Sequence, residues 1–135
     1  MLDPSVASTA AYALAGVING GSASASRIGD GVPVFGKTGI HEQQHTWMDG
    51  SSTRVTTVVW VGNVKGNVRL DRNSANGYSL WRMRHAIWPD MQGAANAKYG
   101  GDAFAKPDSN LTRQVQIDLP NVVGQPIDQA TKTLE

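Results

Sequence analysis

The chain has 135 residues, a length typical of one domain or of one domain joined to the beginning of a second. Hydrophobic residues make up 40% of it and charged residues 17%, which provides enough apolar material for a core and argues against wholesale disorder. A net charge of +1 without a block of like charges gives no argument for electrostatic binding to nucleic acid or to an anionic membrane. The lack of cysteine excludes disulfides and thiolate metal sites.

The first predicted element is a helix over residues 4–19. Asp3 is a suitable N-cap, and Pro4 is suited to the first helical position. Gly20 and Gly21 end the helical pattern, and a small, polar loop is expected over residues 22–31. The apolar positions of this helix are Val6, Ala7, Ala10, Ala11, Leu14 and Ile18.

Three strands are predicted next. β-Branched and aromatic residues indicate a strand over 32–39, and a second strand is expected over 46–48, with Asp49 and Gly50 as the following turn. The strongest strand pattern lies at 53–61. Its centre is apolar on both faces, which predicts a central strand.

The second half is predicted to contain a loop over 62–77 and a helix over 79–97, which Pro89 kinks or divides. Four apolar residues fall on one face of this helix: Leu80, Met83, Ile87 and Met91. Trp81 and Trp88, one residue further round, are predicted to form its buried face. Helices flanking three successive strands indicate an α+β fold, with an antiparallel sheet covered on one face.

Lys37, Thr38 and Gly39 form the motif with the clearest chemistry. A lysine on a strand beside a cleft can attract a substrate carboxylate, and the threonine hydroxyl can hydrogen-bond to it. Gly36 and Gly39 leave the strand edge bare, so that an extended peptide can pair with it. The alternative interpretation of the tripeptide is a surface lysine beside a turn.

Around this motif the chain resembles class A penicillin-binding proteins. The resemblance follows the chain in order through "VASTAAYALAGVINGGSA", "VPVFGKTGI", "TWMDGSSTRVTTVVWVGN" and "AIWPDMQGA". In the tail, a short apolar strand that ends at Pro120 and a helix that starts near Pro126 are predicted. The tail "IDLPNVVGQPIDQATKTLE" is similar to the opening of a PASTA domain. The resemblance implies the C-terminal part of a transpeptidase domain at 1–106, a linker at 107–115 and the incomplete beginning of a PASTA domain at 116–135.

By this resemblance, Lys37, Thr38, Gly39 and Ile40 are substrate-binding residues of a D,D-transpeptidase site. The family usually has threonine or serine at the position of Ile40. Isoleucine keeps the backbone N–H that helps to form the oxyanion hole, but it lacks the hydroxyl. We therefore expect weaker carboxylate recognition.

The nucleophile of such an enzyme is missing. No serine stands three residues before any lysine of the chain, so the serine-x-x-lysine motif is absent and no acyl-enzyme can form. Ser74-Ala75-Asn76 has the form of the family's serine-x-asparagine motif, but it follows the lysine motif, whereas the family places it before. We expect no catalytic residue in this chain and predict that it is inactive alone.

His41-Glu42-Gln43-Gln44-His45 matches the H-E-x-x-H pattern of zinc hydrolases, which is the rival hypothesis. The segment between Gly39 and Gly50 is too short for a stable helix, and the usual downstream glutamate ligand is missing. We therefore predict no metal ligands and no cofactor.

The resemblance also implies the partners and the location of the longer protein. It would cross-link peptidoglycan stem peptides outside the cytoplasmic membrane, bind β-lactams and carry a glycosyltransferase domain upstream. Its membrane contact would come only from an upstream anchor, and nucleic acid is not an expected partner. The alternative is a peptidoglycan-binding or muropeptide-binding module that acts through the PASTA-like tail. Strands expected to flank the sheet are missing, which predicts exposed apolar surface and self-association.

Overall fold

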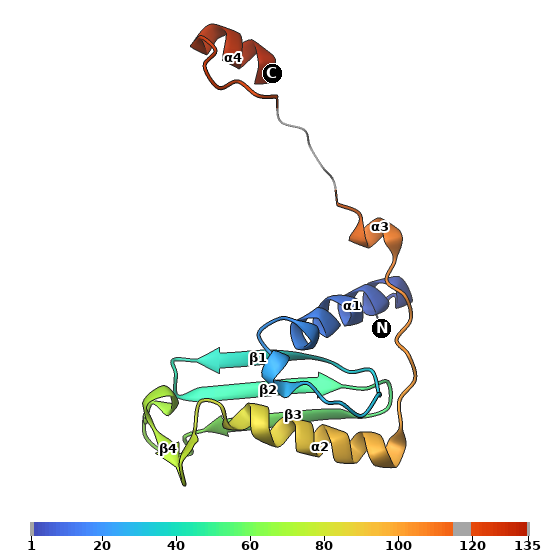
Figure 1. Ribbon diagram of the computed structural model, residues 1–135, viewed down its shortest axis with the longest axis vertical. Helices are drawn as coiled ribbons and strands as arrows, with labels where there is room; N and C mark the ends of the chain where they lie inside the picture. Colours follow the sequence, from blue (N-terminus) through green and yellow to red (C-terminus); the bar gives the residue numbers. More distant parts are fainter. Residues whose placement is uncertain (1, 115–119, 135) are drawn as a thin grey trace.

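A computed structural model describes residues 2–114 and 120–134 of the chain, and its elements confirm an α+β fold with a small antiparallel sheet and flanking helices (Figure 1). The main elements are α1 (Pro4–Asn19), β1 (Phe35–His41), β2 (His45–Ser51), β3 (Thr56–Gly62) and α2 (Met83–Tyr99). The short elements are η1 (Ser24–Ser26), η2 (Leu70–Arg72), β4 (Ser74–Ala75), β5 (Tyr78–Ser79), α3 (Ser109–Thr112) and α4 (Ile127–Leu134).

Helix α1 has the predicted bounds. The Asp3 carboxylate accepts a hydrogen bond from the backbone N–H of Ser5 at 2.8 Å, Pro4 occupies the first turn, and Gly20 follows the last residue. Only Ile18, near its C-terminal end, is buried. The helix is therefore attached to the sheet mainly through its last turns.

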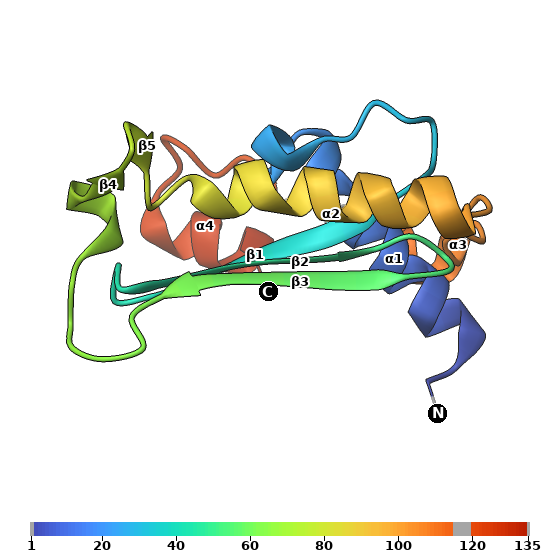
Figure 2. The same ribbon diagram turned by 90° about the horizontal axis from the view of Figure 1, so that it is seen from below.

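The three long strands form one sheet in the order β1-β2-β3, with both pairs antiparallel. Strand β2 is thus the central strand within the described residues, and the prediction that residues 53–61 form the central strand is wrong. The apolar residues at the centre of this strand indicated burial on both faces. Val58 and Trp60, however, are 55% and 44% exposed, so their face of the strand is not buried. Helix α2 covers the other face of the sheet, opposite to the one that carries Val58 and Trp60; Figure 2 shows the sheet edge-on with α2 on one side.

Asp49 and Gly50 lie inside β2, so the predicted turn at these residues is also wrong. A side chain at Gly50 would come within 2.7 Å of the Phe35 carbonyl oxygen and would collide with the Trp88 indole. Glycine is present here because α2 approaches the sheet closely, and not because the chain turns. The turn lies further on, where the backbone N–H of Ser52 donates to the Val55 carbonyl at 3.1 Å.

Strand β1 begins three residues later than predicted and extends two residues further, over Phe35–His41 instead of 32–39. The region predicted as a loop at 62–77 contains η2 and most of a small hairpin formed by β4 and β5. Asn76 and Gly77 turn this hairpin with φ angles of 50° and 80°, the left-handed conformation that an Asn-Gly turn adopts.

Helix α2 begins at Met83, four residues after the predicted start, because Tyr78 and Ser79 belong to β5. Pro89 lies within α2 and does not divide it. The buried residues of the helix are Arg84, Trp88, Gln92 and Asn96, spaced four residues apart. Trp88 thus belongs to the buried face, whereas Trp81 precedes the helix. The apolar residues Ile87 and Met91 are 37% and 45% exposed, so their face is not the buried one.

A hydrogen-bonded chain of polar side chains makes this buried helix face possible. Gln92 accepts a hydrogen bond from the Thr57 hydroxyl at 2.6 Å and donates to the Asn96 side chain at 2.8 Å. Asn96 in turn donates to the Asp30 carboxylate at 2.8 Å. Each buried amide thus has a partner, which offsets the cost of taking it out of water.

The apolar core is small. It comprises Ile18, Ala23, Met48, Val59 and Trp88, contributed by α1, the loop after it, the sheet and α2. Trp88 is fully buried, as predicted, and its indole N–H donates to the Thr57 carbonyl at 3.2 Å. One aromatic side chain therefore joins α2 to the central and outer strands.

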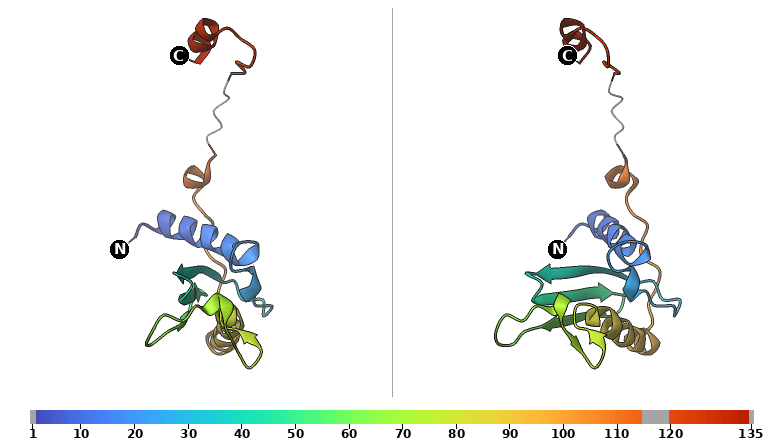
Figure 3. Two further views of the ribbon diagram at one scale, coloured as in Figure 1. Left: turned by 90° about the vertical axis from the view of Figure 1, so that its left-hand side faces the viewer. Right: turned by 60° about the vertical axis from the view of Figure 1, so that its left-hand side comes forward.

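The C-terminal part holds the short helices α3 and α4 (Figure 3). Helix α3 lies in the predicted linker at 107–115, and α4 confirms a helix start next to Pro126. The strand predicted just before Pro120 falls outside the described residues. Within the described ranges, none of the helices has the length and apolarity needed to cross a membrane.

The packing at Gly50 can be tested with Gly50→Ala. The added methyl group has no room between the Phe35 carbonyl and Trp88, so we expect a loss of about 1–3 kcal/mol in the free energy of unfolding. Urea unfolding followed by tryptophan fluorescence measures the change. Gly29→Ala is the control, because nothing lies within 4 Å of a side chain at Gly29. Equal unfolding midpoints for the two variants would contradict this account.

Candidate functional site

The sequence suggested that the lysine motif lies at the end of a strand. The structure places it in the middle of β1. In the described part of the chain, β1 pairs with β2 alone, so its other edge has no strand neighbour. Helix α1 runs along that edge, and the end of β1 extends past the end of the helix (Figure 1). The end of β1 is therefore the part of the motif strand most open to a ligand.

Lys37 and Thr38 point to opposite faces of the sheet, as adjacent residues of a strand must. Lys37 shares a row with Asp49 and Val58 on the face that α2 leaves uncovered. The Lys37 ammonium group donates to the carbonyl oxygen of Thr38 at 2.8 Å. The lysine is exposed, so its charge is available to a ligand at this face.

Asp49 is the cross-strand neighbour of Lys37, but the two charges form no ion pair in the described structure. One carboxylate oxygen of Asp49 is buried without a hydrogen-bond partner, and burial raises the pKa of this carboxyl group. Lys37 therefore has an acidic neighbour, Asp49, that does not pair with its ammonium group in the described structure.

Thr38 points to the covered face, in a row with Met48 and Val59. Its hydroxyl shares a hydrogen bond with the Ser22 hydroxyl at 2.9 Å. A ligand carboxylate that accepts a hydrogen bond from the Thr38 hydroxyl would have to share or replace the bond between Thr38 and Ser22. Ser22, in the loop after α1, was not predicted as a site residue.

Gly39 and Ile40 complete the predicted substrate-binding set. A side chain at Gly39 would come within 3.2 Å of the Trp47 side chain on β2, so glycine keeps this position flat. Ile40 is 53% exposed near the open end of β1. The four predicted residues thus lie on one strand, but their side chains do not converge on one point.

His41 and His45 form the ends of the hairpin that joins β1 to β2, directly opposite each other, with ring centroids 6.0 Å apart. Glu42 and Gln43 turn the chain with φ angles of 48° and 59°. The segment therefore lacks the helical arrangement that places both histidines of a zinc hydrolase on one metal. No cluster of three metal-binding side chains occurs within residues 2–114 and 120–134.

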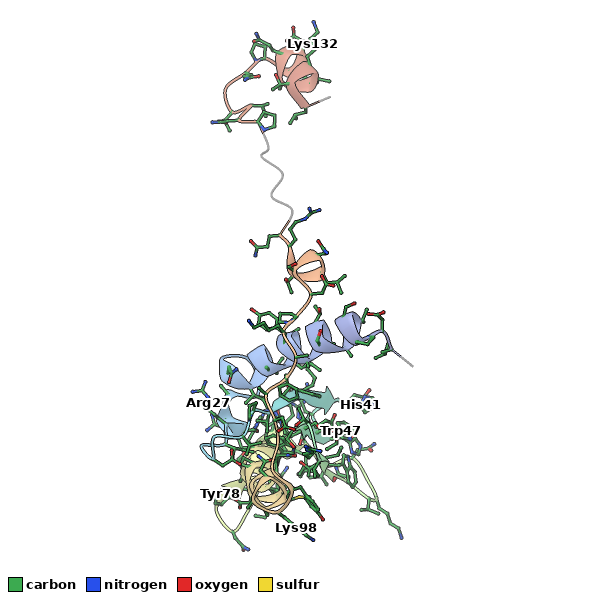
Figure 4. All side chains as sticks on the ribbon, turned by 90° about the vertical axis from the view of Figure 1, so that its right-hand side faces the viewer. Arg27, His41, Trp47, Tyr78, Lys98 and Lys132 are labelled. Carbon is green, nitrogen blue, oxygen red and sulfur yellow. The ribbon has the colours of Figure 1, made fainter. Side chains whose placement is uncertain are left out.

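The hairpin end adds aromatic groups to the uncovered face. The His45 ring stacks on Trp60 at a centroid distance of 5.8 Å and lies 6.0 Å from Trp47. Figure 4 shows His41 and Trp47 on the side of the molecule opposite Arg27. Lys37 therefore shares its sheet face with a partly exposed aromatic surface.

Ser74-Ala75-Asn76 belongs to the hairpin of β4 and β5. Ser74 and Ala75 are exposed in β4, and Asn76 forms the turn. The requirements of an Asn-Gly hairpin thus explain the tripeptide without a catalytic role.

Sequence reasoning missed a contact between Ser26 and His85, which are 59 positions apart. The Ser26 hydroxyl oxygen lies 2.6 Å from Nδ1 of His85, and Ser26 is fully buried in η1. A buried hydroxyl cannot reach a substrate, so this pair is structural. Burial lowers the pKa of His85, and the positive charges of Arg84 and Arg82 lower it further.

Comparison with protein-family models, with curated proteins and with solved structures gave no match.

The burial of His85 beside the positive charges of Arg84 and Arg82 makes stability dependent on pH. Because the pKa of His85 is lower in the folded chain, the unfolded chain takes up its proton first as the pH falls below the ordinary value of 6.5. We expect the urea midpoint to decrease between about pH 7.5 and about pH 5.5. His85→Asn should show a smaller decrease, whereas His41→Asn, at the exposed hairpin end, should behave like the wild type. Equal pH dependence for His85→Asn and the wild type would contradict this assignment.

Proposed function

We propose that this chain is the part of a serine-type D,D-transpeptidase that carries the lysine-threonine-glycine strand, and that it binds the substrate peptide without acylating. The observation that carries the proposal is the position of Lys37–Gly39 on an edge strand of an antiparallel sheet. An edge strand offers free backbone N–H and C=O groups to an extended peptide. The collinear resemblance to class A penicillin-binding proteins supports the same function.

Each residue of the strand has a role in this proposal. The peptide pairs with the edge of β1 near Gly39, where the described chain has no neighbouring strand. The Lys37 ammonium group, which lies at the Thr38 carbonyl oxygen, attracts the carboxylate of the peptide toward the edge of the strand. The Thr38 hydroxyl exchanges its bond with Ser22 for one with the carboxylate, and the backbone N–H of Ile40 stabilises developing negative charge.

The nucleophilic serine and its lysine would come from a segment of the longer protein that this chain does not include. In the proposal, the longer protein acts outside the cytoplasmic membrane on peptidoglycan stem peptides, and β-lactams bind the same site. Acyl transfer through a serine needs no cofactor. The chain alone thus supplies one wall of the active site.

The alternative of a PASTA-like binding module has less support. Val123 and Ile127 are 90% and 87% exposed, and α4 has no buried residue. Residues 120–134, which the structure describes, thus have no core of their own and offer no formed surface for muropeptides.

Peptide binding can be tested by titrating the ¹⁵N-labelled chain with a peptidoglycan stem peptide. We expect amide signals of β1 to shift, and Lys37→Ala to weaken binding about tenfold, because a charge-assisted hydrogen bond is lost. Lys65→Ala is the control, since Lys65 is an exposed lysine in the loop after β3. Shifts confined to other elements, or equal affinity of Lys37→Ala and the control, would contradict the proposed site.

The absence of a nucleophile can be tested by measuring the intact mass of the chain after incubation with excess β-lactam. We expect an unmodified mass, because no serine precedes a lysine at the required spacing. A stable adduct of one β-lactam would mean that this chain contains a working nucleophile. The prediction of an inactive chain would then be wrong.

A further inference from the structure

Arg84 is a buried charge without a counter-charge among the described residues. Its exposed fraction is 4%, and its Nε atom has no hydrogen-bond partner. One terminal nitrogen donates to the Trp81 carbonyl at 2.6 Å. The two salt bridges of the described chain belong to Arg54 and Arg69. A guanidinium group stays ionised under all ordinary conditions, so its burial here has a free-energy cost that no acidic side chain of the described structure offsets.

This guanidinium lines a cavity of about 350 Å³ between the loop after α1 and the start of α2. We call the cavity the arginine pocket, and its lining residues are Ser22, Ala25, Trp81, Arg82, Arg84 and His85. The lining includes two arginines and no acidic residue. An anion that entered the pocket would meet positive charge without repulsion.

The orientation of the Arg84 guanidinium and the apolar residues beside it indicate which class of anion the pocket suits. The Arg84 guanidinium lies over the Trp81 ring, 5.3 Å from its centroid, which holds the planar group in one orientation. A single oriented guanidinium matches the two oxygens of a carboxylate. The Trp81 ring and the Ala25 methyl group provide an apolar wall beside it.

We infer that the arginine pocket binds the carboxylate of a small organic acid that carries a short aliphatic group. Arg84 holds the carboxylate through its terminal N–H groups, and Arg82 adds positive charge at the rim. The aliphatic group lies against Trp81 and Ala25. This site lies on the covered side of the sheet, away from the face that carries Lys37, and it does not rest on the proposed transpeptidase function.

Propionate is a suitable probe, because it combines a carboxylate with one short aliphatic group. The ¹⁵N-labelled chain is titrated with sodium propionate, with sodium chloride at matched ionic strength, and with inorganic phosphate. We expect propionate to shift the Arg84 Nε–H and Trp81 indole N–H signals, while the indole signals of Trp47 and Trp60 stay in place. Arg84→Met should weaken propionate binding about tenfold, because a charge-assisted hydrogen bond to the ligand is removed.

Arg72→Met is the matched control, since Arg72 is an exposed arginine in η2, and it should bind propionate like the wild type. If Arg84→Met does not give a folded spectrum, Arg84→Lys replaces it: lysine keeps the charge but lacks the planar pair of donors, so weaker binding is again expected. Equal shifts with chloride, unchanged affinity in the Arg84 variants, or tighter binding of phosphate than of propionate would each overturn the inference.

Discussion

The packing of Trp88 against the sheet is the constraint on which the rest of this structure depends. The indole is fully buried, donates to the Thr57 carbonyl and lies where a side chain at Gly50 would be. It joins Met48 and Val59 in a core that contains few other residues. A small core depends strongly on each large member, because one aromatic side chain provides much of the apolar area that folding removes from water.

The position of Trp88 also decides which other residues of α2 are buried. Residues four positions apart lie on one helix face, so Arg84 and Gln92 turn toward the sheet together with Trp88. The Gln92 amide finds hydrogen-bond partners there, whereas the Nε atom of Arg84 does not. The uncompensated charge in the arginine pocket is thus a consequence of the helix orientation that the core requires.

The same sheet separates two candidate sites. Lys37 faces the uncovered side, which also presents Trp47 and Trp60, while Thr38 faces the covered side and contacts Ser22. The proposed peptide site uses the open edge of β1, where both sides can be reached. The arginine pocket uses the covered side alone. Ser22 lines that pocket, and its hydroxyl shares a hydrogen bond with the Thr38 hydroxyl. This bond connects the two sites across the covered side of the sheet.

The sequence by itself determined the elements whose signals are local. The Asp3 cap and Gly20 set the bounds of α1, and the Lys37–Gly39 tripeptide was correctly assigned to a strand. Only the tertiary structure decided that β3 is an outer strand, that Gly50 admits Trp88 and that Arg84 is buried. Burial depends on which distant segment packs against a residue. Neither the periodicity of α2 nor its composition carries that information, and for this reason the arginine pocket could not be predicted from the sequence.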